Sequence, residues 1–151
     1  MAFYKHVFFD RLKVSEEFLN EHGEVIREKL EFAAAEFNRV HGNMFAINMC
    51  LHAASSVILS NPDYLNETLG VLGSTPGLAG KDPTMVLTVI VLSRLIQWDA
   101  SRAASEARNA KTKEARSRAE DYEANLATLR QGIAEINWII GEEAMRIVGF
   151  E

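Results

Sequence analysis

The side chains best suited to hold a transition metal are four histidines and one cysteine, and their spacing does not fit a metal site. Carboxylate-bridged metal sites in helical bundles use a glutamate three residues before a histidine. The residues three before the histidines are Phe3, Leu19, Asn38 and Met49. Cys50 and His52 are two positions apart, so on a helix they would point about 200° away from each other. We therefore predict no metal and no cofactor.

Acidic side chains at helical spacing point to a different chemistry, a magnesium-dependent nucleotide hydrolase built from helices. Such all-α enzymes bind Mg²⁺ through E-E-x-x-E and E-x-x-D motifs, because Mg²⁺ prefers carboxylate oxygens. No aspartate here has a glutamate three residues before it, and neither Glu-Glu doublet has the third acid. We keep this hydrolase as an alternative, on the glutamate pairs Glu21/Glu24, Glu28/Glu31 and Glu120/Glu123.

The loop that ends in Gly80-Lys81 has part of a phosphate-binding motif. The full motif is G-x-x-x-x-G-K-[ST], in which the last hydroxyl binds Mg²⁺. Thr75 stands at the first glycine position, and Asp82 replaces the hydroxyl with a carboxylate that would repel phosphate. The serine-hydrolase motif G-x-S-x-G is also absent. We predict a flexible loop at 73–83 and a protein that is not an enzyme.

Basic residues are concentrated between positions 101 and 118, a segment that contains six bases and two acids. On one helix they scatter around the axis, and no zinc finger or helix-turn-helix glycine accompanies them. Nucleic-acid binding stays an alternative. Solvated charge, or pairing with an acidic helix, is favoured over it. Residues 15–36 and 119–151 each hold seven acids against two bases and could supply such a helix. The candidate anion contacts are Arg102, Arg108, Lys111, Lys113, Arg116 and Arg118.

Four aromatic residues lie in the first twelve positions. Aromatic side chains supply large apolar area and are enriched at interfaces. We expect residues 1–14 to pack on the chain's own core, and the alternative is an aromatic N-terminal segment that docks on a neighbouring subunit or partner. The residues concerned are Phe3, Tyr4, Phe8 and Phe9.

The bulk composition indicates one globular domain. The chain has 151 residues, of which 48% are hydrophobic and 25% charged, and a net charge of −5, which gives no general reason to expect nucleic acid or an anionic membrane. Cys50 has no partner for an intrachain disulfide. The most apolar run, 85–98, is shorter than the ~20 residues of a membrane span. We predict a cytoplasmic protein with no membrane contact.

Capping residues and apolar periodicity predict an all-α, elongated bundle of about five helices. Ser15 and Asn43 have the hydroxyl and amide groups that cap helix starts. Asn61-Pro62 and Asp82-Pro83 combine a cap with a proline in the first helical position. The segment 85–92 is apolar on every face, which fits a central helix, although a buried strand is the alternative.

The last third of the chain predicts a long helical hairpin. Alanines step by three and four residues from Ala100 to Ala110, and the next apolar residue is Ala115, five positions on. An uninterrupted helix over 84–131 would be about 70 Å long. We predict a break within 109–114, and a continuous rod is the alternative. The apolar ladder that follows is Ala115, Ala119, Tyr122, Leu126, Leu129, Ile133, Ile136, Ile140, Ala144 and Ile147.

The ladder and the two-sided apolar helix at 44–59 demand more cover than the remaining helices offer. Leftover apolar area favours a second copy, and a symmetric dimer is the commonest closed solution. We predict a homo-oligomer, a dimer for preference, that binds another protein. A phage or mobile element is a guess at its origin. The predicted seam is Leu129, Ile133, Ile136, Ile140 and Ile147.

Overall fold

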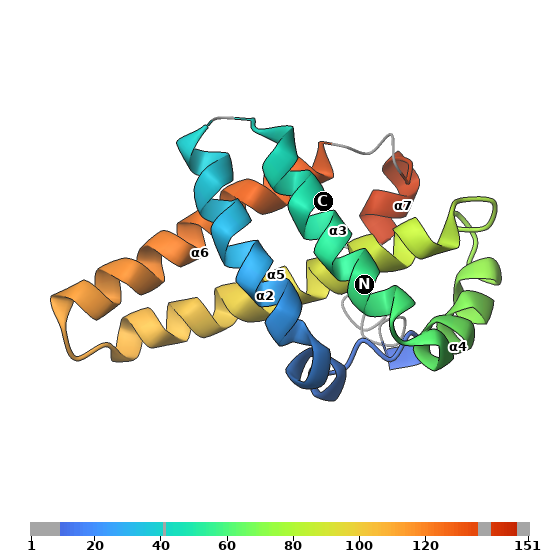
Figure 1. The fold of residues 1–151 in the computed structure, drawn as a ribbon, viewed down its shortest axis with the longest axis horizontal. Coiled ribbons are helices and arrows are strands. Elements are labelled where there is room, and N and C mark those ends of the chain that lie inside the picture. The colour runs from blue at the N-terminus through green and yellow to red at the C-terminus, as the bar shows by residue number, and fades with distance from the viewer. Residues whose placement is uncertain (1–9, 41, 136–139, 148–151) are drawn as a thin grey trace.

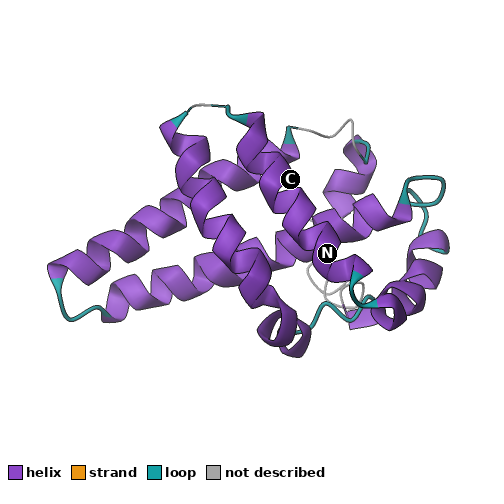
Figure 2. Ribbon diagram, viewed as in Figure 1, coloured by secondary structure: helices purple, strands orange, loops and turns teal. Residues whose placement is uncertain are grey.

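The computed structural model describes residues 10–40, 42–135 and 140–147, and these form six helices and no strand (Figures 1 and 2). The all-α prediction is confirmed. The helices, in chain order, are α2 (Glu16–Arg39), α3 (Met44–Leu59), α4 (Pro62–Gly73), α5 (Pro83–Asn109), α6 (Lys113–Ala134) and α7 (Glu142–Ile147).

The helix starts lie where the capping residues predicted them. Ser15, Asn43 and Asp82 each accept a hydrogen bond in the side chain from a backbone N–H two or three residues on. This satisfies one of the donors that the first helical turn leaves without a partner. Asn61 differs, because its amide donates instead to the carbonyl of Val57 at 2.7 Å, and the proline that follows begins α4 without a side-chain cap.

The predicted break between α5 and α6 is confirmed. α5 ends at Asn109, Ala110 is extended, and Thr112 caps α6 by accepting a hydrogen bond at 3.1 Å from the backbone N–H of Ala115. The two helices pack side by side as an antiparallel hairpin. Its closed end projects beyond α2 and α3 and makes the molecule elongated (Figure 1).

The apolar start of α5 is the centre of the fold. Every residue from Val86 to Ser93 is buried, which shows that this segment is the central helix and that the strand alternative is wrong. α3 and α4 both pack against α5, and α2 packs against α3 and α6. A helix with no exposed face over two turns requires neighbours on all sides, and these contacts supply them.

The C-terminal ladder is not one helix, which corrects the reading of its full length as a single stripe. α6 ends at Ala134, and α7 begins at Glu142. Gly141 has a φ of +87°, a left-handed conformation that glycine adopts without strain. Ile140, within this interruption, and Ala144, on α7, both lie in the hydrophobic core. The apolar spacing therefore continues while the helix does not.

The loop of residues 74–82 joins α4 to α5, and a buried side chain anchors it. Leu78 is 3% exposed and belongs to the hydrophobic core. Its backbone N–H donates to the carbonyl of Thr75 at 3.1 Å, and Lys81 N–H donates to the carbonyl of Leu78 at 3.2 Å. The loop is thus a series of turns attached to the core by one leucine.

Cys50 provides a test of the core. Its side chain is fully buried on α3, and burial raises the pKa of the thiol to about 12. We expect no reaction with a disulfide reagent at pH 8 in native buffer, and one reactive thiol per chain after unfolding in guanidinium. Because an unfolded thiol ionises near ~8.5, this group should lower the free energy of unfolding as pH rises from there towards 12. Rapid native labelling would contradict this burial.

Candidate interaction site

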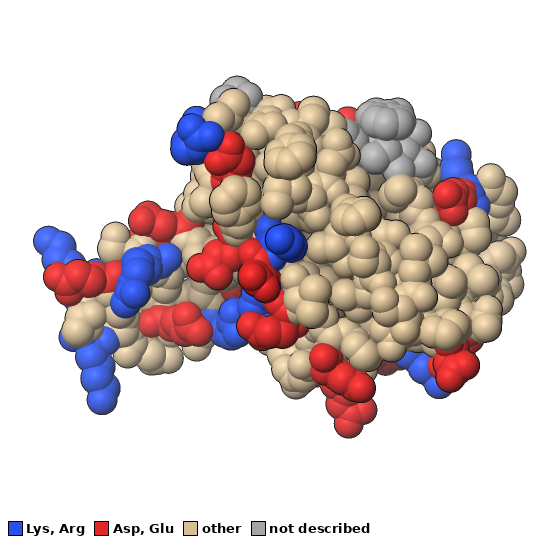
Figure 3. All heavy atoms as spheres, viewed as in Figure 1, with Lys and Arg blue, Asp and Glu red and all other residues tan. Residues whose placement is uncertain are grey.

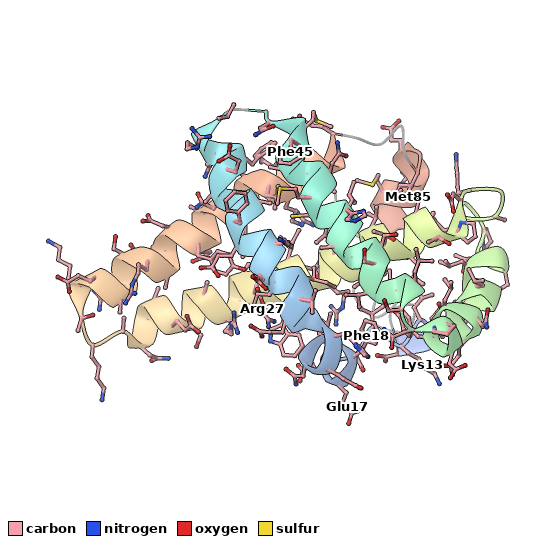
Figure 4. All side chains as sticks on the ribbon, in the orientation of Figure 1. Lys13, Glu17, Phe18, Arg27, Phe45 and Met85 are labelled. Atoms are coloured by element: carbon pink, nitrogen blue, oxygen red, sulfur yellow. The ribbon has the colours of Figure 1, made fainter. Side chains whose placement is uncertain are left out.

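All six of the large apolar side chains that are exposed in the described part of the chain lie on α2, on α3 or in the turn between them. Single exposed apolar residues are normal, whereas a concentration on one surface typically marks a binding site. Phe45 is 65% exposed at the end of the hairpin where α2 and α3 are joined (Figure 4). We call this surface the α2–α3 face, and its residues are Val25, Phe32, Val40, Met44, Phe45 and Leu59.

The α3 part of the α2–α3 face has no charged side chain. No Lys, Arg, Asp or Glu occurs from position 40 to position 62, which covers the whole of α3. On the side of the molecule drawn in Figure 3, charged side chains gather along α5 and α6 and are sparse over α3. Burying the α3 part of this surface costs little, because no charged side chain of α3 has to lose its water.

The charges beside the face belong to α2. Glu36 and Arg39, one and two turns after Phe32, form an ion pair of 2.6 Å. The hydrogen bond from Arg39 lowers the pKa of the Glu36 carboxyl, so this carboxyl stays ionised. An apolar centre with charged groups at its edge is the usual composition of a protein interface.

No single described helix is long and apolar enough to cross a membrane, and α3 with α4 meets the length and composition criteria only as a pair bent by 105°.

A second surface is formed by the projecting end of the hairpin. We call residues 102–123 the arm. Nearer the turn than Tyr122, the buried side chains between its two helices are small, namely those of Ala103, Ala107 and Ala119. An open groove of about 400 Å³ runs along one side, lined by Ala104, Ala107, Arg108, Arg116, Glu120 and Glu123.

The candidate anion contacts are all exposed on the arm, but they do not form one basic patch. Arg108 and Arg116 share the groove, and Lys111 and Lys113 lie at the turn. Arg102 is 3.8 Å from Asp99 and 3.9 Å from Glu106. Counted over 102–123, six bases stand beside five acids. The arm is therefore bipolar, which is unlike the positive surface of a nucleic-acid-binding protein.

A buried polar cluster holds the base of the arm to α2. Asp99 on α5 is fully buried, and both of its carboxylate oxygens accept from Nε of Arg27, at 3.0 and 2.9 Å. The hydroxyl of Tyr122 on α6 donates to the same carboxylate at 2.8 Å. Figure 4 shows Arg27 where α2 crosses α5. One side chain thus joins three helices.

The cluster is electrostatically consistent. The hydrogen bonds that Arg27 donates to Asp99 raise the pKa of the Arg27 guanidinium. Burial raises the pKa of the Tyr122 hydroxyl, and the negative charge of the Asp99 carboxylate raises it further. The guanidinium therefore stays charged and the hydroxyl stays protonated. With Asp99 closed off from solvent, the group has no path to a substrate, and its role is to fix helices. The sequence interpretation missed this cluster.

The predicted seam lies mostly inside the chain. Leu129, Ile133 and Ile140 are buried in the hydrophobic core of one copy, which corrects their assignment to a surface between copies. Ile147 is partly buried against the same core. Ile136 and the four aromatic residues Phe3, Tyr4, Phe8 and Phe9 lie outside the described residues.

The glutamate pairs do not assemble a common site. Glu21/Glu24 and Glu28/Glu31 are on α2, and Glu120/Glu123 line the arm groove. Within the described residues, no three His, Cys, Asp or Glu side chains are grouped in a way that would hold a metal ion. No protein-family model, no curated protein and no solved structure matches this chain.

Proposed function

We propose that this protein is a non-enzymatic interaction protein that self-associates through the α2–α3 face and, once assembled, binds another protein. The observation that supports this proposal is the concentration of exposed large apolar side chains on that one helical hairpin. The predicted seam on the C-terminal ladder is replaced by this surface, since the ladder is core.

A second copy suits this face for two reasons. Homodimer interfaces are more apolar than transient ones, and the α2–α3 face has both exposed aromatic rings and an uncharged helix. Two helical hairpins related by a two-fold axis also form a four-helix arrangement, which buries an apolar stripe on every helix. Each aromatic ring of the face would then be buried in both copies of the dimer.

The test replaces the two exposed rings, Phe32→Gln together with Phe45→Gln. Both positions are more than half exposed, so the isolated fold should be unaffected. We expect a wild-type dimer by sedimentation velocity at micromolar concentration in 500 mM salt. The variant should dissociate with a constant at least roughly 100-fold higher, since hot-spot residues typically contribute 2 kcal/mol or more each.

The control neutralises two exposed acids elsewhere, Asp63→Asn on α4 with Glu142→Gln on α7, and should leave the dimer intact. A wild-type protein that stays monomeric at 100 μM in this buffer would overturn self-association through the face. So would a Phe32→Gln/Phe45→Gln variant that sediments like the wild type.

A further inference from the structure

The arm groove contains four charged side chains that have no partner within the described part of the chain. Arg108, Arg116, Glu120 and Glu123 make no hydrogen bond or ion pair with another described residue. Arg102, just before the groove on α5, does have such a neighbour, because it lies 3.9 Å from Glu106. The groove therefore presents both signs of charge to whatever it contacts.

The two signs are separated along the arm. Arg108 lies in the last turn of α5 and Arg116 near the start of α6, so both lie near the closed end. Glu120 and Glu123 lie one and two turns further towards the body, and Glu123 is seven positions, or roughly 10 Å along the helix axis, from Arg116. The groove thus has a positive end and a negative end, with two alanines between the helices.

We propose that the arm groove binds the same groove of a second copy, with the two arms antiparallel about a two-fold axis perpendicular to them. This rests on the proposed function, because it names a surface through which the chain self-associates. In this arrangement the arginine pair of each copy faces the glutamate pair of the other. The reverse, parallel arrangement would place like charges together, so the charge order selects one orientation.

The floor of the groove allows the arms to approach closely. Ala104 and Ala107 present only methyl groups, so the helices of two arms can pack with little intervening side chain. Two antiparallel hairpins then form a four-helix bundle. The contact relies on exposed ion pairs, which are individually weak and are screened by salt. It should therefore form at low salt and dissociate at high salt.

The arm groove and the α2–α3 face are different surfaces, and each chain has one of each. A chain that uses both binds one copy through each two-fold contact. The smallest closed assembly with two such contacts is a tetramer of dihedral symmetry. We expect wild-type protein to sediment as a dimer in 500 mM salt and as a tetramer in 50 mM salt.

The experiment isolates the arm by working in the Phe32→Gln/Phe45→Gln protein. One derivative carries Arg108→Glu/Arg116→Glu, which makes its groove wholly acidic. The other carries Glu120→Lys/Glu123→Lys, which makes its groove wholly basic. In 50 mM salt the parent should dimerise, and each derivative alone should dissociate at least roughly tenfold more readily. An equimolar mixture of the two should recover a heterodimer, because every facing pair is again unlike.

A matched control reverses two charges at the turn outside the groove, Lys111→Glu with Lys113→Glu, and should keep the parent's dimer. Circular dichroism checks folding, and the neutral Arg108→Gln/Arg116→Gln pair replaces any reversed derivative that does not fold. A parent that stays monomeric in 50 mM salt would overturn the arm contact. Derivatives that dimerise alone, or a mixture that stays monomeric, would do the same.

The two proposals fail separately. Loss of the dimer of wild-type protein in 500 mM salt concerns only the α2–α3 face. Loss of the low-salt dimer in the Phe32→Gln/Phe45→Gln protein concerns only the arm groove.

Discussion

Replacing Asp99 with alanine is expected to lower the free energy of unfolding by about 3–5 kcal/mol, the usual cost of removing one partner from a buried ion pair. The guanidinium of Arg27 is 14% exposed and would lose both of its bonds to the carboxylate. The hydroxyl of Tyr122 would lose its acceptor in the same step. Guanidinium unfolding followed by circular dichroism measures the change.

Two further variants show whether the loss of stability comes from the burial of the ion pair or would follow from breaking any ion pair. Tyr122→Phe removes a single hydrogen bond to the carboxylate and should cost about 1.5–3 kcal/mol. Arg39→Ala breaks the exposed pair with Glu36 and should leave the unfolding midpoint unchanged, since solvent screens that pair. An Asp99→Ala protein that unfolds with the wild type would show that the carboxylate is hydrated in solution.

Local signals predicted the helix boundaries well because the physics that sets them is local. The side chains of Asn43 and Asp82 bond to backbone groups only two or three residues on. The break before Thr112 follows from a phase slip within five residues and from the length that an unbroken helix would need. Neither argument requires knowledge of the rest of the chain.

The prediction of a seam between copies on the apolar ladder was wrong, because apolar spacing shows which side chains avoid water and does not show what covers them. Leu129 and Ile133 have the same spacing whether they face a second copy or their own core. In the structure both are core residues of one chain, and the helix that bears them stops before Ile140. The periodicity alone gave no sign of this stop.

The candidate surfaces and the buried cluster could not be predicted from the sequence for a related reason, because their residues come together only in the folded chain. Asp99 looks like any solvated aspartate in the sequence, and its partners Arg27 and Tyr122 are 72 and 23 residues away. The two-sided apolar pattern of 44–59 did indicate a second contact for α3. Its continuation onto α2 through Phe32 appears only once the hairpin is formed.

A glycine inside α6 makes the packing between α2, α3 and α6 unusually close, and Gly132→Val should cost about 3 kcal/mol. A Cβ at this position would lie 2.5 Å from Cζ of Phe37 and 3.2 Å from Cδ1 of Ile47. Phe37 is only 6% exposed and has little free space in which to move. Overpacking of this kind typically costs 1–3 kcal/mol, and the branched side chain adds two further carbons.

The matched control is Gly70→Val in α4, where nothing lies within 4 Å of the new Cβ. It should change stability little, because valine is no worse than glycine in an exposed helix. Combining Gly132→Val with Phe37→Ala tests the cause directly. If the ring is the obstacle, removing it gives the valine room, and the double variant should lose less stability than the two single variants added together. Strict additivity in guanidinium unfolding would mean that Phe37 does not limit the position, and that helices α2 and α6 lie further apart in solution.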